Sequence, residues 1–313
     1  MSPAPLALGA GLGLTFAACV AWPLALYTFT LGLFGLPHVI AELRYVGQRF
    51  GGRWSTTVVA VVGVLLAGVV SARVLSMLDV ITSAQGRTVE LSLVALLVAV
   101  SLPALWARSM LRAAAGLGLV VAVAWGTQVA PVTTAVVLAG LHNLTPVGFI
   151  AEGAPETSRR RWVTGAVIVF LALPALIATG WPYQALAPLG ITALEWSPLG
   201  AGTLSDHLPV YVPAAAIDTS WAVHLFTAFV FAQCMHYAVV IHGLPRLVPG
   251  GLDRRFSMII AALGVVTLVA FMGDFGTSRR LYGVIAAVHA WIEVPLLLAA
   301  LLGAERLTTA RAG

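Results

Sequence analysis

Two histidines in this chain are each followed, four residues later, by a glutamate. His38 precedes Glu42, and His289 precedes Glu293. Residues four apart lie on the same face of an α-helix, so each spacing predicts an imidazole beside a carboxylate. Both pairs fall in strongly apolar segments that we interpret as membrane spans. Because ionisable groups are costly at membrane depth and are usually functional there, the two pairs are the first candidates for a functional site.

The composition around these pairs is that of an integral membrane protein. Of the 313 residues, 60% are hydrophobic and only 9% are charged, and the mean hydropathy of +0.97 lies well outside the soluble range. The net charge of +5 comes without a basic stripe or a recognition motif, which excludes a nucleic-acid-binding role. Cys19 and Cys234 both lie in apolar runs, which argues against a disulfide framework or a thiolate zinc site.

Apolar runs of about 20 residues are long enough to cross a bilayer as helices. We expect spans at about 57–77, 89–107, 113–130, 133–152, 162–180, 219–243, 257–273 and 281–302. A further apolar stretch, about 6–40, contains Pro23 and is either one kinked helix or two shorter ones. The sequence therefore predicts an all-α polytopic bundle of about nine (eight to ten) transmembrane helices, forming one domain over residues 1–313.

Arginines fall in every second connection between the predicted spans. By the positive-inside rule these connections and the C-terminal tail are cytoplasmic. They hold Arg44, Arg49, Arg53, Arg108, Arg112, Arg159, Arg160, Arg161, Arg246, Arg254, Arg255, Arg306 and Arg311. The exceptions, near outer connections, are Arg73, Arg87, Arg279 and Arg280. The long loop at about 181–218 has no arginine and is predicted to be non-cytoplasmic. Its many apolar residues favour a position on the membrane surface or over the bundle.

Histidines from four separate spans fall at a similar predicted depth. Counted at about 1.5 Å per residue, they lie roughly 10–20 Å from the cytoplasmic edge, and both glutamates lie one turn nearer that edge. Nitrogen and oxygen ligands without thiolates suit iron, copper or zinc, and sets with open positions are typical of non-haem iron. We therefore predict a site for one or two Fe(II) ions, in which the glutamates either complete a two-iron site or orient the imidazoles. Its residues are His38, His142, His236, His289, Glu42 and Glu293.

Other polar residues near these histidines are candidate supports or further ligands. Gln233 lies three residues before His236, and Asn143 and Thr145 follow His142 closely. His242 either turns inward as a ligand or faces the membrane interface. Trp291, between His289 and Glu293, is a candidate wall of a substrate cavity or a packing residue. We assign no catalytic residue beyond the metal site.

The outer side of the bundle is predicted to contribute little to the site. His207 and His224 belong to that side and are left out of the cluster. Glu90 and Asp274 are expected to pair there with arginine. The sequence otherwise suggests that the outer half of the bundle has no continuous polar path.

The segment FGLPHVIAELR (residues 34–44) resembles a motif of the Brp/Blh family of bacterial membrane β-carotene 15,15'-dioxygenases. In that family a Gly-Leu-Pro-His closes an early span and an acidic residue follows one turn later. The resemblance implies that His38 is a metal ligand, with Glu42 standing where the family tends to have aspartate. In mid-chain, the nearest match to the family's histidine-rich acidic segment is LHNLTPVGFIAE, which has a single histidine.

The resemblance implies a polytopic iron enzyme of the bacterial inner membrane that cleaves a carotenoid with dioxygen to give retinal. Its partners would be dioxygen, a lipid-soluble substrate and membrane lipid. The residues alone predict more broadly a non-haem iron oxygenase acting on a lipid-soluble substrate. The absence of any HxxxH or HxxHH pattern separates this chain from alkane hydroxylases, desaturases and sterol-type hydroxylases.

The alternative function is a proton-coupled or metal-ion transporter, because pumps also use intramembrane histidines and carboxylates. A transporter would need polar groups across the whole bilayer, often on broken helices. A haem-b protein is a third reading, and the two paired glutamates count against it.

Overall fold

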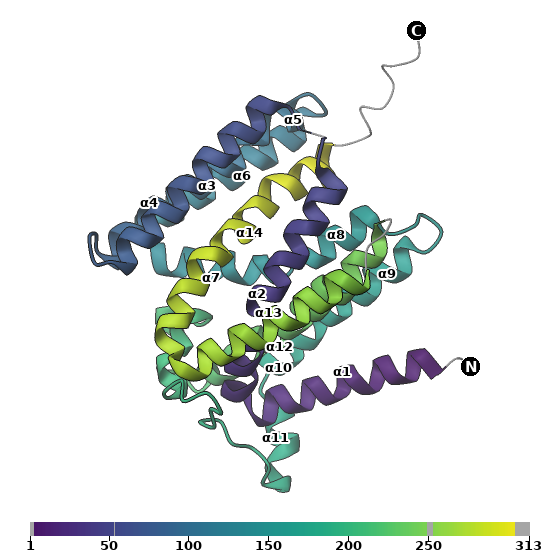
Figure 1. Ribbon diagram of the computed structural model, residues 1–313, viewed down its shortest axis with the longest axis vertical. Coiled ribbons are helices and arrows are strands. Elements are labelled where there is room, and N and C mark those ends of the chain that lie inside the picture. Colours follow the sequence, from purple (N-terminus) through teal and green to yellow (C-terminus); the bar gives the residue numbers. More distant parts are fainter. Residues whose placement is uncertain (1–2, 53, 249–252, 304–313) are drawn as a thin grey trace.

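The computed structural model describes residues 3–52, 54–248 and 253–303, and these form helices and loops without any strand. Within those ranges, nine helices are long and apolar enough to cross a membrane. Figure 1 shows how the helices are arranged. The expected all-α bundle of about nine spans is confirmed. The spans are α2 (Pro23–Phe50), α3 (Thr56–Met77), α4 (Ser83–Val100) with α5 (Leu102–Trp106), α6 (Met110–Val129), α7 (Pro131–His142) with α8 (Thr145–Gly153), α9 (Arg159–Val167) with η1 (Ile168–Ala172) and α10 (Leu173–Ala178), α12 (Trp221–Ala238) with η6 (Val239–Gly243) and η7 (Leu244–Leu247), α13 (Arg254–Gly273), and α14 (Phe275–Gly303).

The first apolar stretch forms two helices rather than one. α1 (Pro3–Ala21) ends before Trp22, whose backbone leaves the helical region, and Pro23 then begins α2. Proline fits this first position because its missing N–H would have no partner inside the helix. α2 continues to Phe50, so Arg44 and Arg49 lie within this helix and not in a connection. Arg53 lies outside the described residues.

The arginine clusters gather at one end of the bundle. Arg44 in α2 bonds Asp253 just before α13 at 2.8 Å, and Arg49 bonds Glu152 in α8 at 2.8 Å. We call this the arginine-rich end, and it holds Arg44, Arg49, Arg108, Arg112, Arg159, Arg160, Arg161, Arg246, Arg254 and Arg255. We call the opposite end, which holds the 181–218 segment, the loop end. Arg306 and Arg311 lie outside the described residues.

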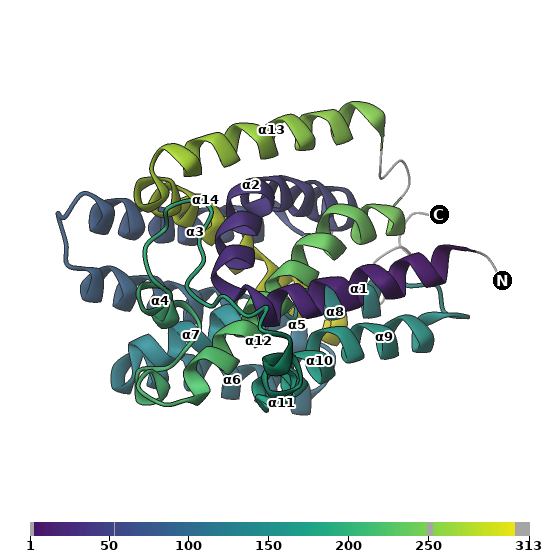
Figure 2. The same cartoon turned by 90° about the horizontal axis from the view of Figure 1, so that it is seen from below.

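The helices α2 and α14 run through the middle of the bundle, with α3 and α4 on one side and α12 and α13 on others (Figures 1 and 2). α13 and α2 approach closely at Gly264, where a Cβ atom would lie 2.7 Å from the Leu33 carbonyl oxygen. Pro37 leaves that carbonyl without its usual helical donor, because proline has no N–H. A glycine in α13 therefore fits against the turn of α2 that precedes His38.

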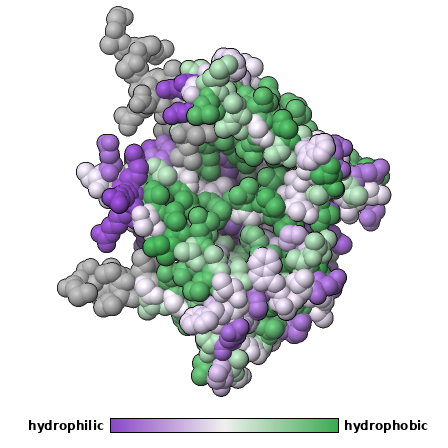
Figure 3. Space-filling model, turned by 180° about the vertical axis from the view of Figure 1, so that it is seen from behind, coloured by the Kyte–Doolittle hydropathy of each residue, from purple (hydrophilic) through white to green (hydrophobic). Residues whose placement is uncertain are grey.

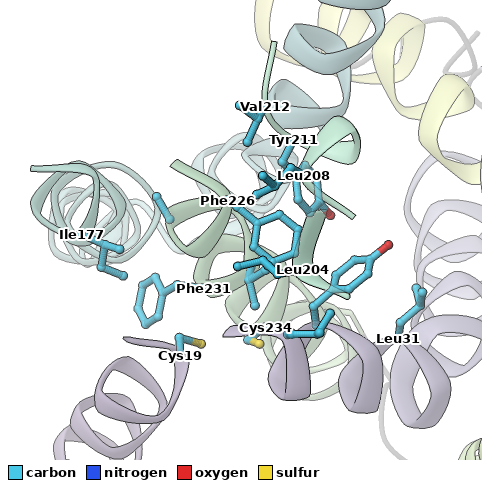
Figure 4. Close-up of a cluster of buried hydrophobic side chains, with 14 of the residues drawn as sticks. Cys19, Leu31, Ile177, Leu204, Leu208, Tyr211, Val212, Phe226, Phe231 and Cys234 are labelled. Carbon is cyan, nitrogen blue, oxygen red and sulfur yellow. The ribbon is translucent and has the colours of Figure 1, made fainter. Parts of the chain in front are cut away.

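The 181–218 segment folds over the loop end of the bundle. It contains α11 (Trp181–Leu186) and the short turns η2 (Ala187–Leu189), η3 (Leu204–Asp206), η4 (Leu208–Val210) and η5 (Ala214–Ala216). Figure 4 shows Leu204, Leu208 and Tyr211 packed with Phe226 and Phe231 of α12. The sequence favoured a position either on the membrane surface or over the bundle, and the segment packs over the bundle.

The outer surface of the bundle is largely apolar. Figure 3 shows hydrophobic residues across the middle of one face and hydrophilic residues toward its edges. This is the surface expected of helices that face lipid tails.

Candidate metal centre

The four histidines predicted to share one depth meet at one point. Ring nitrogens of His38, His142, His236 and His289 all lie within 4.8 Å of one another. They come from four helices: α2, α7, α12 and α14. His38, His236 and His289 are fully buried, and His142 is partly buried.

Breaks in helical regularity occur next to two of these histidines. His142 is the last residue of α7, and α8 begins at Thr145. The Thr145 hydroxyl donates to the His142 carbonyl oxygen at 2.8 Å, which satisfies a group that the break would otherwise expose. After His236, α12 continues into the π-helical turn η6 at Val239. Such turns are frequent at functional sites.

Hydrogen bonds orient two of the rings in the way expected of metal ligands. The Nδ1–H of His38 donates to the Phe34 carbonyl oxygen at 3.1 Å. That of His142 donates to Glu293 Oε2 at 2.9 Å. In a neutral ring whose Nδ1 carries the proton, Nε2 has a free lone pair that can bind a metal. Metal-bound histidines are usually oriented by such a hydrogen bond from the other ring nitrogen.

The spacing of the ring nitrogens also fits coordination. His38 Nε2 lies 3.0 Å from His289 Nε2. With metal–nitrogen bonds of about 2.1 Å, two ligands at a right angle to each other lie about 3.0 Å apart. The two rings are therefore close enough to bind the same first-row ion.

Both glutamates reach the cluster, but each contacts a histidine of another helix. Glu42 and Glu293 are fully buried. Glu293 accepts the bond from His142, and Glu42 Oε2 lies 3.5 Å from His236 Nε2. The side-by-side pairing expected within each HxxxE spacing is therefore not the main contact of either carboxylate. Glu42, Glu293 and His289 still form a second group of possible ligand atoms within 4.8 Å of one another.

Several buried polar atoms of this cluster have no hydrogen-bond partner among the described residues. They are both carboxylate oxygens of Glu42, Oε1 of Glu293, both ring nitrogens of His236 and Nδ1 of His289. A buried unpaired carboxylate costs several kcal/mol in an apolar setting unless a proton or a cation accompanies it. The donor set and its unsatisfied atoms therefore fit a bound cation.

A cavity of about 1270 Å³ extends from the cluster to the loop end of the bundle. Its inner end is formed by His38, His142 and His289. Its walls carry polar residues that the sequence analysis did not single out, chiefly Tyr27, Tyr211, Tyr237 and Tyr282. The expectation that the outer half of the bundle has no polar path is therefore wrong.

Tyr237 directly contacts the histidine cluster, and the sequence analysis did not single it out. Its ring stacks on His38, with centroids 4.1 Å apart, and its hydroxyl lies 3.4 Å from that of Tyr282. It directly follows His236 in sequence, which was the available signal. Successive residues point about 100° apart around a helix, so the sequence did not show that both side chains reach the site.

Trp291 lines the cavity, as expected of a cavity wall. Its indole N–H donates to Glu90 Oε1 at 2.8 Å. Arg73 bonds both oxygens of Glu90, at 2.6 and 2.9 Å, and also the Gly283 carbonyl. The expected pairing of Glu90 with arginine is confirmed. Asp274 instead caps the start of α14 by accepting the Thr277 N–H at 2.9 Å.

The candidate supporting residues divide into three near the site and one outside it. Gln233 and Asn143 are buried and line the cavity. The side-chain oxygen of Gln233 accepts a hydrogen bond from the Tyr211 hydroxyl and does not bond a histidine. Thr145 bonds the backbone of His142. His242 is exposed and lines a separate groove of about 180 Å³ beside α13. It does not join the cluster.

The two histidines left out of the cluster do lie elsewhere. His207 is buried at the loop end, where it bonds the Ala201 carbonyl oxygen through Nε2 at 2.8 Å and Arg279 through Nδ1 at 3.2 Å. It lines the outer part of the cavity. His224 packs beside Tyr183, with ring centroids 4.8 Å apart. Cys19 and Cys234 are buried and are not joined by a disulfide.

Comparison of the chain with models of known protein families finds no match, and comparisons with curated proteins and with solved structures find none either. The resemblance of residues 34–44 to the Brp/Blh family therefore stays a prediction from that segment. What the protein does has to be inferred from the site itself.

Proposed function

We propose that the protein is a membrane-embedded, non-haem iron oxygenase that acts on a lipid-soluble substrate. The observation that carries this proposal is the convergence of four imidazoles, three of them fully buried, at the inner end of a large cavity. Imidazoles and carboxylates without thiolates suit iron, which when bound supplies the means to activate dioxygen.

The chain's own residues would hold the ion and shield it. His38, His142, His236 and His289 would bind it. Phe34 and Glu293 fix two of the rings through their outer N–H groups. The apolar cluster at the arginine-rich end, which includes Phe149, would keep water away from that side of the ion.

The two carboxylates support either one ion or two. With one ion, Glu42 and Glu293 would orient the imidazoles and balance the charge of the ion. With two, their unpaired oxygens would bind a second ion next to the first. The metal content of purified protein separates these cases, since it would be about one or about two iron atoms per chain.

Metal analysis of protein purified after growth in iron-supplied medium is the direct test. We expect iron at one or two equivalents and its loss from the His236→Ala variant, with the helical content unchanged. Stoichiometric zinc, or no metal in protein that is otherwise folded, would end the oxygenase proposal.

Carotenoid cleavage is the most specific substrate proposal, and it depends on the resemblance of residues 34–44. Coexpression in cells that make β-carotene tests it directly. Loss of colour together with the appearance of retinal would support it. Unchanged pigment would direct attention to other lipids.

A transporter is the second candidate, and the polar walls of the cavity favour it more than the sequence did. The polar path, however, stops at the cluster, because apolar residues such as Phe149, Val240 and Leu244 pack on the arginine-rich side. We therefore place the oxygenase first. Metal-ion or proton flux into proteoliposomes would reverse that order.

We further propose that the arginine-rich end faces the cytoplasm of a bacterial cell and that the loop end lies on the other side. The imbalance of arginines supports this orientation. Labelling of cysteines introduced into the loop at 181–218 from outside intact cells would test it.

A further inference from the structure

The arginines that depart from the positive-inside pattern share one location. Arg73 lies in α3, Arg87 in α4, and Arg279 and Arg280 in α14, and all four line the cavity that ends at the histidines. They are all the arginines at the loop end within the described residues. Their common position at the outer part of the cavity calls for a reason other than topology.

One of these arginines is already neutralised by the protein. Arg73 bonds both oxygens of Glu90. The carboxylates of Asp206 and Asp274 also line the cavity, but each is engaged in capping a turn or helix. These bonds hold the pKa of both groups below its usual value, so both remain charged.

Arg279 is the best placed of the remaining arginines to contact a ligand. It is half-buried. Its Nη1 donates to His207 Nδ1 at 3.2 Å, and its guanidinium carbon lies 6.0 Å from the Tyr27 ring centroid. Because His207 donates to Ala201 through Nε2, its Nδ1 is fixed as an acceptor and holds the guanidinium in place. A guanidinium has five N–H donors, and oxyanions bind it in a fork geometry.

The wall between the arginines and the histidines offers both apolar and polar contacts. Leu91, Val136, Ala139 and Ala287 line it beside the four tyrosines. An apolar chain fits such a wall, whereas a ligand without any polar group would leave the outer arginines unmatched.

We propose that the substrate is an anionic amphiphile, whose carboxylate or phosphate group binds at Arg279 while its apolar chain extends to the histidines. This inference rests on the proposed function only for the reaction at the inner end; binding of the amphiphile needs no metal. It narrows the lipid-soluble substrate to one with an acidic end group and disfavours a pure hydrocarbon, including the β-carotene implied by the resemblance of residues 34–44.

Ligand displacement from metal-depleted protein in zwitterionic nanodiscs tests the proposal. The reporter is cis-parinaric acid, a fluorescent polyene carboxylate, and the competitors are oleate, oleyl phosphate, oleyl alcohol and β-carotene. Empty nanodiscs correct for partition into lipid. We expect both anions to displace the reporter at concentrations about tenfold lower than the alcohol. The stronger of the two anions identifies the end group.

The variants separate a specific site from general charge. Arg279→Gln should weaken oleate binding about tenfold and leave oleyl alcohol within about twofold, while Arg279→Lys should restore part of the loss. Arg160 is an exposed arginine at the opposite end of the bundle, so Arg160→Gln is the matched control. It should change the affinity for neither oleate nor oleyl alcohol. Equal binding of alcohol and anion, tighter binding of β-carotene, or an unchanged Arg279→Gln variant would overturn the proposal.

Metal analysis keeps this outcome distinct from that of the proposed function. If the protein binds iron but does not prefer anions, the oxygenase proposal stands and the amphiphile proposal fails. If the protein prefers anions but binds no metal, the amphiphile proposal stands and the oxygenase proposal fails.

Discussion

Two buried polar clusters lie along α14, and they differ in how completely the protein satisfies them. Glu90, near the loop end, receives two bonds from Arg73 and one from Trp291. Glu42 and Glu293 instead leave three carboxylate oxygens without a hydrogen-bond partner among the described residues. A carboxylate with a structural role is matched by the protein's own groups, whereas an unmatched buried one needs a proton or a cation to accompany it. The difference supports the proposal that the histidine cluster is the functional centre.

Removal of a histidine from the cluster should have the largest effect, and it would test whether the histidine cluster binds the metal. His38→Ala should bring bound iron close to zero, because it removes a ligand and also the ring on which Tyr237 stacks. Elemental analysis of the purified variant is the measurement. His224→Ala, outside the cluster, is the control, and equal metal loss in both variants would show that the effect is not local.

Chelation should destabilise the protein only through the histidine cluster. A ligand present at about 100 times its dissociation constant stabilises the folded state by roughly 2.7 kcal/mol. The melting temperature of metal-loaded wild type should therefore fall when a chelator is added, and that of His236→Ala should not. A fall of the same size in His236→Ala would place the stabilising metal elsewhere.

The two kinds of buried carboxylate should respond in opposite ways to neutralisation. Glu90→Gln should cost on the order of 2 kcal/mol, allowing for the partial exposure of Arg73, because it removes the charge that Arg73 faces. Metal content should stay unchanged. Glu42→Gln should leave the metal-free protein as stable or more stable, because it removes an unmatched charge, but should weaken metal binding.

Thermal melts of the metal-free proteins, combined with metal titrations, would measure both effects. The comparison between the two clusters would fail if Glu42→Gln destabilised the metal-free fold as much as Glu90→Gln does.

The sequence was sufficient to predict the spans and the meeting of four histidines. Apolar runs mark helices directly, and counting residues from the arginines gives depth, so side chains at equal depth in one bundle become candidates to meet. The partner of each glutamate could not be predicted in this way. That depends on the rotation and tilt of each helix, which long-range packing determines, as where Gly264 of α13 meets the Leu33 carbonyl.

Features at the loop end were the hardest to predict for the same reason. Arg73 and Arg279 stand out in the sequence only as exceptions to a topology rule. Their common cavity depends on how α3, α14 and the 181–218 segment pack together. The polar path lined by the tyrosines was missed because tyrosine also serves in apolar packing and carries no charge that would mark it.

The smallest expected effect concerns His207, which lies outside the cluster and has a hydrogen-bond partner on each ring nitrogen. Burial lowers its pKa, and the nearby Arg279 adds to this, although Asp206 and the bond to Ala201 oppose it. The unfolded chain then binds a proton more readily than the folded one, so stability is complete above the unfolded pKa near 6.5 and declines as pH falls below it. The melting temperature should drop between pH 7.5 and pH 5 by more in wild type than in His207→Gln. The difference between the two proteins removes the contribution of the metal-site histidines, which both retain. An identical decline in both proteins would show that His207 does not titrate in this range. The hydrogen bonds of His207 would then have no measurable effect on the pH dependence of stability.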